Sequence, residues 1–259
     1  MDNEKLEQAK EAADSYTAFK ARLEACRDCQ ASFGFEPRPI VWGHPHARVV
    51  VISQAPGLKV HEYGRPFSDL SGKKLRQKWL CVSEEQFYNP DLFYFSPAGH
   101  CYPGKDKKGH DKKPPRKCWD KWTAKEIEYM KDARLFIVIG LEAASRLFPG
   151  RKLEDLVFSR LNYQGKDCFV LPHPSPLNQN WPKKNPEFES RVLPALQKEL
   201  YQVLDLPFSQ LERYRAGEVP PRESWQKPLR TKASPDLESS QLENNSKPKI
   251  EKKEKRGRS

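Results

Sequence analysis

Long apolar stretches are missing from this sequence: no segment approaches the ~20 consecutive apolar residues that a membrane span requires. The first 24 residues carry charges throughout and lack the apolar region of a secretory signal. The mean hydropathy of −0.86 agrees with both observations. We therefore expect neither an integral membrane protein nor a secreted one, and no membrane partner.

Cysteine is also scarce, with six residues in a chain of 259. Few cysteines spread through a large chain without a secretory signal indicate metal or cluster ligation rather than a disulfide scaffold. Two residues separate Cys26 from Cys29, and sixteen separate Cys101 from Cys118. Four thiolates can hold a [4Fe–4S] cluster or a tetrahedral zinc ion, and the spacing alone leaves both open.

Positive charge is in excess and unevenly placed. Lys and Arg total 46 against 35 Asp and Glu, a net charge of +11 that is compatible with a polyanionic partner. Residues 227–259 carry ten basic and five acidic side chains and no aromatic residue, so they cannot bury enough surface to offset chain entropy. We predict a domain over residues 1–204, a connector over 205–226 and a disordered basic tail over 227–259. Lys252–Arg258 suits either a nuclear-import or nucleic-acid patch or a merely solvated end.

Four short apolar runs predict buried parallel strands, because the spacers of about 30–40 residues between them have room for crossover helices. Helical periodicity over Met1–Leu23 and Phe188–Leu204 adds a helix at each end of the domain. We predict an α/β fold with three α/β/α layers around a central, mainly parallel four-stranded sheet, whose functional residues follow the carboxyl ends of the strands. The predicted strands are Val49–Ile52, Leu92–Phe95, Leu135–Ile139 and Phe169–Leu171.

Three polar segments appear in this order along the chain: Ser53-Gln-Ala-Pro-Gly57, Gly64-Arg-Pro-Phe-Ser-Asp-Leu-Ser-Gly72 and His173-Pro-Ser-Pro-Leu-Asn178. Together with the four cysteines they resemble the uracil-DNA glycosylase superfamily over roughly residues 20–200, closest to its iron–sulfur families 4 and 5. The resemblance implies a monofunctional DNA glycosylase of base-excision repair that flips uracil, or a related deaminated base such as hypoxanthine or xanthine, and hydrolyses its N-glycosidic bond. The alternative is an iron–sulfur nucleic-acid-binding protein of the same fold with little or no glycosylase activity.

The resemblance also implies partners and a location. We expect DNA as the partner and a monomer as the active form. A bacterial protein of this kind would be cytoplasmic and associated with the nucleoid, and a eukaryotic one would be nuclear.

Site residues on the base side follow from the same motifs. His173 resembles the residue that hydrogen-bonds the developing base anion, and Phe67 resembles the aromatic that stacks on the flipped base. Leu177 resembles the apolar wedge that fills the gap in the duplex. Gly57 in the first segment and Asn178 after the wedge complete the substrate-binding candidates. Each side chain could instead be an ordinary loop or core residue.

The sugar side departs from the family pattern. Family 4 has a glutamate where this chain has Gln54, which can orient a water but cannot accept its proton. Asp69 is retained from the family 5 motif and is the candidate for positioning water or stabilising the cationic sugar, although it could equally cap a helix. The family 4 base-reading asparagine is replaced by Pro97, so the neighbouring Ser96 becomes a candidate and strict uracil selection is in doubt.

For the thiolates of Cys26, Cys29, Cys101 and Cys118, the resemblance implies a structural [4Fe–4S] cluster, with zinc as the alternative. The segment between the last two cysteines is dense in cations, which suit phosphate contacts or a solvated basic loop.

Overall fold

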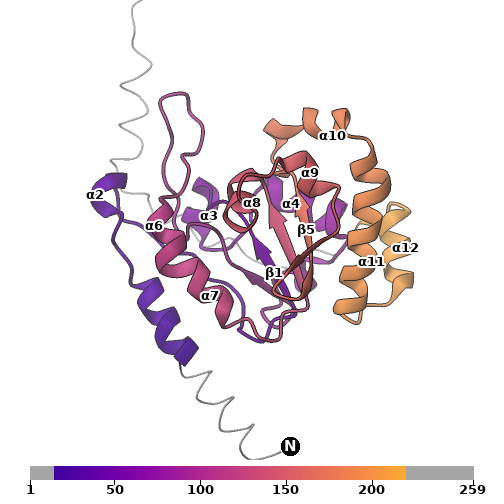
Figure 1. Cartoon of the computed structure of the whole chain (residues 1–259), viewed down its shortest axis with the longest axis horizontal. Helices are drawn as coiled ribbons and strands as arrows, with labels where there is room; N and C mark the ends of the chain where they lie inside the picture. Colours follow the sequence, from indigo (N-terminus) through magenta and orange to yellow (C-terminus); the bar gives the residue numbers. More distant parts are fainter. Residues whose placement is uncertain (1–14, 220–259) are drawn as a thin grey trace, which may run out of the picture. The chain divides into compact units, whose positions relative to one another are not determined.

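The computed structural model describes residues 15–219, so the predicted tail 227–259 lies outside the described residues. Its centre is a five-stranded sheet in the order β2-β1-β3-β5-β4 (Figure 1). The strands are β1 (Val49–Ile52), β2 (Phe93–Phe95), β3 (Leu135–Ile139), β4 (Leu161–Tyr163) and β5 (Lys166–Leu171).

Four strands of the sheet are parallel, as predicted. β1 pairs with β2 on one side and β3 on the other, so that Val51 lies opposite both Phe95 and Ile137, and β3 pairs with β5. Every residue of β1, β2 and β3 is buried, which explains their continuous apolar sequences. The α/β prediction with a mainly parallel central sheet is therefore confirmed.

The fifth strand was not predicted. β4 runs antiparallel to β5 at the edge of the sheet and has only three residues, of which only Leu161 is buried. A tight turn joins the two strands, and both of its residues, Gln164 and Gly165, have positive φ angles of 51° and 77°. Such left-handed pairs are typical of two-residue hairpins. The sequence hides this strand because its short, mixed pattern carries no apolar run.

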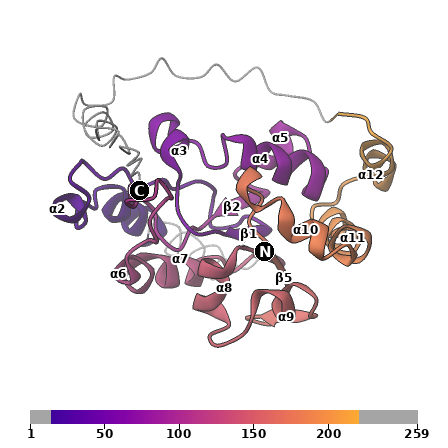
Figure 2. The same cartoon turned by 90° about the horizontal axis from the view of Figure 1, so that it is seen from above.

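Helices cover both faces of the sheet, with α3, α4 and α5 on one side and α8 and α9 on the other (Figure 2). No helix within residues 15–219 combines the length and apolar character needed to cross a membrane. Residues 15–24 are helical, and the remaining helices are α2 (Gln30–Phe33), α3 (Leu58–Tyr63), α4 (Leu70–Lys74), η1 (Leu75–Leu80), α5 (Glu84–Tyr88), α6 (Arg116–Cys118), η2 (Trp119–Thr123), α7 (Ala124–Glu128), α8 (Leu141–Leu147), α9 (Leu153–Val157), η3 (Pro176–Asn178), α10 (Asn180–Lys184), η4 (Phe188–Val192), α11 (Leu193–Val203) and α12 (Phe208–Arg215).

The two predicted terminal helices lie against the domain. Helix 15–24 buries Tyr16, Phe19 and Leu23. The predicted Phe188–Leu204 helix is formed by η4 and α11, which bury an apolar stripe that includes Leu196 and Leu200. Amphipathic spacing therefore locates both helices, although residues 1–14 lie outside the described part.

Helix α12 lies within the predicted connector 205–226 and packs on α11. Leu211 and Tyr214 are buried, and the Phe208 ring stacks on Tyr201 with centroids 6.2 Å apart. Arg215 Nε donates to Gln197 Oε1 at 2.8 Å. The packed part of the chain thus extends beyond the predicted boundary at residue 204.

This packing predicts different results for two truncations. A chain ending at residue 219 keeps α12, so its melting temperature should match that of the full chain. A chain ending at Leu204 exposes the α11 surface and loses the burial of Leu211 and Tyr214, so it should lose on the order of 2–4 kcal/mol of unfolding free energy. Thermal melting and urea denaturation, each followed by circular dichroism, measure the two quantities, and equal stability of the two truncations would contradict the structural role of α12.

Candidate active site

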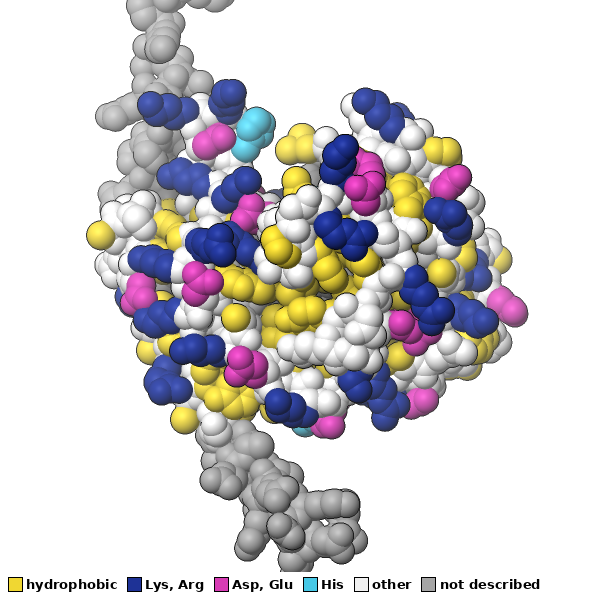
Figure 3. All heavy atoms as spheres, in the orientation of Figure 1, with side chains coloured by type: hydrophobic (Ala, Val, Ile, Leu, Met, Phe, Trp, Pro, Cys, Tyr) yellow, Lys and Arg dark blue, Asp and Glu magenta, His cyan; other side chains and the backbone are white. Residues whose placement is uncertain are grey.

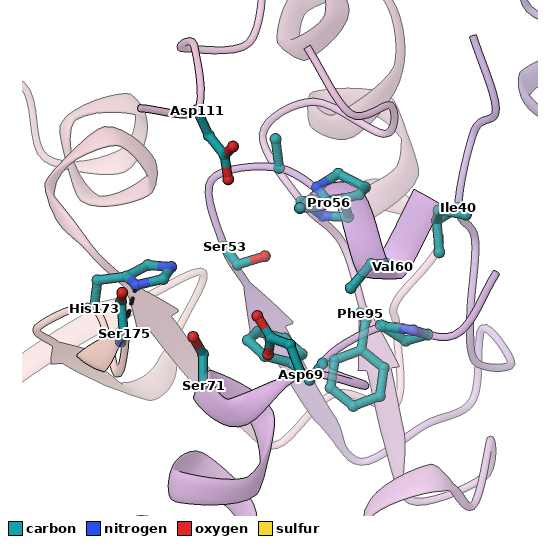
Figure 4. Close-up of a pocket in the computed structure, with 15 residues that line it drawn as sticks. Ile40, Ser53, Pro56, Val60, Asp69, Ser71, Phe95, Asp111, His173 and Ser175 are labelled. Atoms are coloured by element: carbon teal, nitrogen blue, oxygen red, sulfur yellow. Dashed lines mark hydrogen bonds between the residues drawn. The ribbon is translucent and has the colours of Figure 1, made fainter. Parts of the chain in front are cut away.

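A cavity of about 150 Å³ opens at the carboxyl ends of β1, β2 and β5 (Figure 4). Parallel strands bring their following loops to one edge of the sheet, which is where open α/β sheets bind ligands. The three predicted polar segments all contribute to this cavity. It is lined by Ile40, Ser53, Ala55, Pro56, Gly57, Val60, Pro66, Phe67, Asp69, Ser71, Phe95, Pro97, Asp111, His173 and Ser175.

The loop after β1 forms one wall, which includes Gly57 but not Gln54. Gly57 precedes α3 and has an extended backbone. The carbonyl of Gln54 accepts the Gly99 N–H at 3.1 Å, and the carbonyl of Ser53 accepts the Ala98 N–H at 2.7 Å. The loops after β1 and β2 are therefore fastened to each other by their backbones, and the Gln54 side chain does not reach the cavity.

Phe67 is held in an unusual backbone conformation. Its φ angle of 52° lies in the left-handed region, which is rare for residues other than glycine. Its carbonyl accepts the Tyr88 hydroxyl at 3.0 Å, and a Cβ placed on Gly72 would lie only 1.7 Å from that oxygen. The ring packs against Phe95 with centroids 5.6 Å apart. Phe67 thus fits both interpretations of the sequence, because it packs on the core and also lines the cavity.

Asp69 likewise occupies both of its predicted positions, the N-cap of a helix and the wall of the cavity. It is the N-cap of α4, where Oδ1 accepts the Gly72 N–H at 2.9 Å. The same half-buried side chain lines the cavity. A cap bond fixes the rotamer of a carboxylate, so Asp69 presents its negative charge to the cavity in one orientation.

His173 follows β5 and stands beside the cavity, half-buried. The Ser175 N–H donates to His173 Nδ1 at 3.2 Å, and Asn178 Nδ2 donates to the His173 carbonyl at 3.1 Å. Burial lowers the pKa of the imidazole, while the nearby carboxylates of Asp69 and Asp111 oppose that shift. The ring is therefore neutral near pH 7 with its proton on Nε2, because Nδ1 is occupied as an acceptor.

Leu177 and Asn178 lie outside the cavity on η3. Leu177 is 89% exposed, and its N–H donates to Ser175 Oγ at 3.2 Å. A leucine held on a short helix and open to water is available to an external surface. Asn178 does not line the cavity, and it is linked to the cavity through the hydrogen bond that its side chain donates to the His173 carbonyl.

Ser96 is not brought into the cavity. It is fully buried, and its hydroxyl donates to Glu126, which also accepts the Tyr94 hydroxyl at 2.7 Å. The neighbouring Pro97 lines the cavity instead. The sequence does not show that Pro97, rather than Ser96, lines the cavity, because the position of Ser96 depends on a buried glutamate about thirty residues away in the chain.

Asp111 lines the cavity and was missed by the sequence analysis. It belongs to the segment between Cys101 and Cys118, where the surrounding lysines gave the impression of a purely basic loop. The cavity also contains the serines Ser53, Ser71 and Ser175, whose hydroxyls could hydrogen-bond a base. The sequence offers no signal that separates Asp111 from Asp106, the other carboxylate of the same basic run.

A second, separate pocket gathers the four predicted ligand cysteines. Cys26 and Cys29 come from the end of helix 15–24 and the start of α2, whereas Cys101 and Cys118 flank the basic segment. All four are free thiols. Burial raises the pKa of Cys118 to about 11 and raises that of Cys101 further above its usual range. The predicted ligands thus converge around one point.

The basic segment folds as a hairpin over residues 104–112. Lys105 and Asp111 form an antiparallel bridge, and the Lys112 N–H donates to the Gly104 carbonyl at 2.9 Å. Lys side chains stand out on this hairpin in Figure 3, with acidic and histidine side chains among them. Lys121 pairs with Asp28 at 2.6 Å and Lys113 with Glu142 at 3.2 Å, whereas the exposed Lys107, Lys108 and Lys112 form no ion pair with any described residue.

The sequence model of the uracil DNA glycosylase superfamily matches residues 40–197, which is more than half of the chain and contains the whole cavity lining. Members of this superfamily cleave the bond between a base and its deoxyribose. The fold, the order of the three segments and this match agree: the chain belongs to the uracil DNA glycosylase superfamily.

Proposed function

We propose that this protein removes uracil, or a related deaminated base, from DNA by hydrolysing the N-glycosidic bond. Superfamily membership supports a DNA glycosylase, that is, a hydrolase that binds DNA. The observation that carries the finer proposal is the meeting of a neutral imidazole, an oriented carboxylate and an aromatic ring in one cavity: His173, Asp69 and Phe67.

The base side of the reaction needs a donor for negative charge. As the bond breaks, its electron pair moves onto the base, and negative charge develops on a carbonyl oxygen of the base. The Nε2–H of His173 is available for that oxygen, because Ser175 keeps Nδ1 as the acceptor. A fixed donor in a partly desolvated cavity stabilises such charge more than water does. Phe67 supports the ring of the flipped base by stacking.

The sugar side needs negative charge, because the deoxyribose becomes cationic as the base leaves. Asp69 supplies it from an orientation fixed by its bond to the Gly72 N–H. Gln54 stays away from the cavity and has no part in this proposal.

DNA contacts are provided outside the cavity. Lys107, Lys108 and Lys112 on the hairpin are free to neutralise phosphates, and the exposed Leu177 can enter the gap that the flipped nucleotide leaves. Base selection falls to the hydroxyls and backbone of the cavity wall, because Pro97 offers no amide to read a pyrimidine.

The cysteine pocket supports a structural [4Fe–4S] cluster held by Cys26, Cys29, Cys101 and Cys118. A tetrahedral zinc with Zn–S bonds of ~2.3 Å would bring its sulfurs to roughly 3.8 Å from one another. No three of the cysteine sulfurs within residues 15–219 lie within 4.8 Å of one another, which favours a larger group. A cluster there would tie helix 15–24 to the base of the hairpin and would take no part in the reaction.

Replacing His173 with alanine tests the base side. The side chain packs little, so the variant should stay folded. Single-turnover excision from a uracil-containing oligonucleotide, read by alkaline cleavage, should fall about 10²–10³-fold with little change in DNA affinity. His46→Ala is the matched control, because His46 is exposed and precedes β1 at the opposite edge of the sheet. Absence of base release by the wild-type chain on uracil, hypoxanthine and xanthine substrates would favour the nucleic-acid-binding alternative.

The Asp69→Asn variant separates charge from capping. Asparagine keeps an oxygen for the Gly72 N–H, so the melting temperature should hardly change. The excision rate should fall about 10²–10³-fold, because the negative charge beside the sugar is lost. The Asp69→Ala variant removes both the negative charge and the capping oxygen, so it should also lose about 1 kcal/mol of stability. A normal rate in Asp69→Asn would assign the residue to capping alone.

Cluster ligation has its own test. Anaerobically purified protein should be brown and contain about four irons per chain. Cys118→Ala should lose iron and stability together, whereas Cys168→Ala, which removes a buried thiol from β5, should keep its iron. Stoichiometric zinc without iron in the native protein would overturn the cluster.

A further inference from the structure

Asp111 is a second carboxylate at the cavity, and its position is set by the hairpin over residues 104–112. The bridge to Lys105 fixes the base of the hairpin. Asp106 Oδ1 accepts the N–H groups of Lys108 at 2.8 Å and His110 at 2.9 Å, which closes the tip. The backbone around Asp111 is thus defined by hydrogen bonds within its own segment.

The Asp111 carboxyl faces the cavity from the side opposite Asp69 (Figure 4). A Cβ placed on Gly57 would lie 3.7 Å from Asp111 Oδ2, so the carboxyl reaches the loop after β1. Its charge acts on His173 from across the cavity. The residue as a whole remains exposed, as expected at a cavity mouth that a bound DNA strand would cover.

Asp111 differs from the other carboxylates near the site in having no hydrogen-bond donor among the described residues. Asp69 accepts a backbone N–H, and Glu126 accepts two hydroxyls. A carboxylate offers about four lone-pair sites; Asp69 has committed one of them to the Gly72 N–H and Asp111 none to a described residue. The lone pairs of Asp111 are available to a water molecule.

The surroundings of Asp111 also favour proton acceptance. Partial burial raises the pKa of its carboxyl, and the charge of Asp69 adds to the shift, whereas Lys105 and His173 oppose it. Tyr102 at the start of the same segment is the remaining titratable group that faces it, and burial keeps that phenol neutral with a pKa of about 12. A carboxylate with a raised pKa is a stronger base than an ordinary aspartate.

We propose that Asp111 is the catalytic residue that binds and activates the hydrolytic water. This inference rests on the proposed function. The water oxygen bonds to C1′ of the deoxyribose as the bond from C1′ to the base nitrogen breaks, and its proton passes to the Asp111 carboxylate. The electron pair of the broken bond leaves with the base, whose anion accepts the hydrogen bond from His173. Asp69 stabilises the cationic sugar without exchanging a proton.

Asp111→Asn in the full chain tests this assignment. Single-turnover excision of uracil at pH 7–8 should fall about 10²–10³-fold, while affinity for the same oligonucleotide and the melting temperature stay unchanged. Asp106→Asn is the matched control, because it makes the same substitution on the same hairpin and keeps its hydrogen-bond acceptor. It should retain the wild-type rate.

The pH profile provides a readout that a structural role would not move. The wild-type rate should rise as Asp111 loses its proton and then level off, with the rise lying above the usual range of an aspartate. That rise should persist in Asp69→Asn, although the rate is low, and should vanish in Asp111→Asn. An unchanged rate and profile in Asp111→Asn, with an active wild type, would overturn this inference alone. Absence of excision by the wild type would overturn the proposed function and the inference together.

Discussion

The parallel pairing of β1 with both β2 and β3 is the constraint on which the site depends. Because these strands run in one direction, the loops after β1, β2 and β5 all begin at the same edge. The chain leaves β1 toward β2 and later returns to the other side of β1, which creates a crevice beside the end of β1. Residues more than a hundred positions apart, such as Ser53 and His173, therefore line one cavity.

The buried carboxylate of Glu126 on α7 links the carboxyl end of β2 to neighbouring parts of the chain. Glu126 Oε1 accepts the hydroxyl of Tyr94 in β2, and Oε2 accepts the hydroxyl of Ser96 just after β2 and lies 3.4 Å from His100 Nε2. Tyr94 in turn shares a 2.8 Å hydrogen bond with Tyr16 on helix 15–24. Desolvating a carboxylate is costly unless donors replace the water, so these bonds act together. Since His100 also lines the cysteine pocket, one network joins the cysteine pocket, β2 and the loop that carries Pro97.

Features that depend on local pattern could be read from the sequence, and features that depend on tertiary partners could not. Continuous apolar runs located the four parallel strands, and the motif order located His173, Phe67 and Asp69 on one cavity. Ser96 and Gln54 were misplaced relative to the cavity because their orientation is decided by Glu126 and by the backbone bonds to Gly99. α12 was read as a connector, because its stability comes from contacts with α11. The sequence did not single out Asp111, because lysines dominate the charge of its segment although they do not determine how that segment folds.

The two carboxylates of the cavity are distinguished by what already binds them. Asp69 sits at a helix end, where the Gly72 N–H holds its carboxylate in one orientation. Asp111 sits on a hairpin where no residue of the described range 15–219 donates to its carboxyl, and partial burial disfavours the charge. In the proposed mechanism the fixed orientation of Asp69 suits it to face the cationic sugar, and the raised pKa of Asp111 suits it to accept a proton. The same hairpin carries Lys107, Lys108 and Lys112, so a phosphate backbone bound there would cover Asp111 and increase its desolvation. In the proposed mechanism, substrate binding and the strength of the base would thus be coupled through this hairpin.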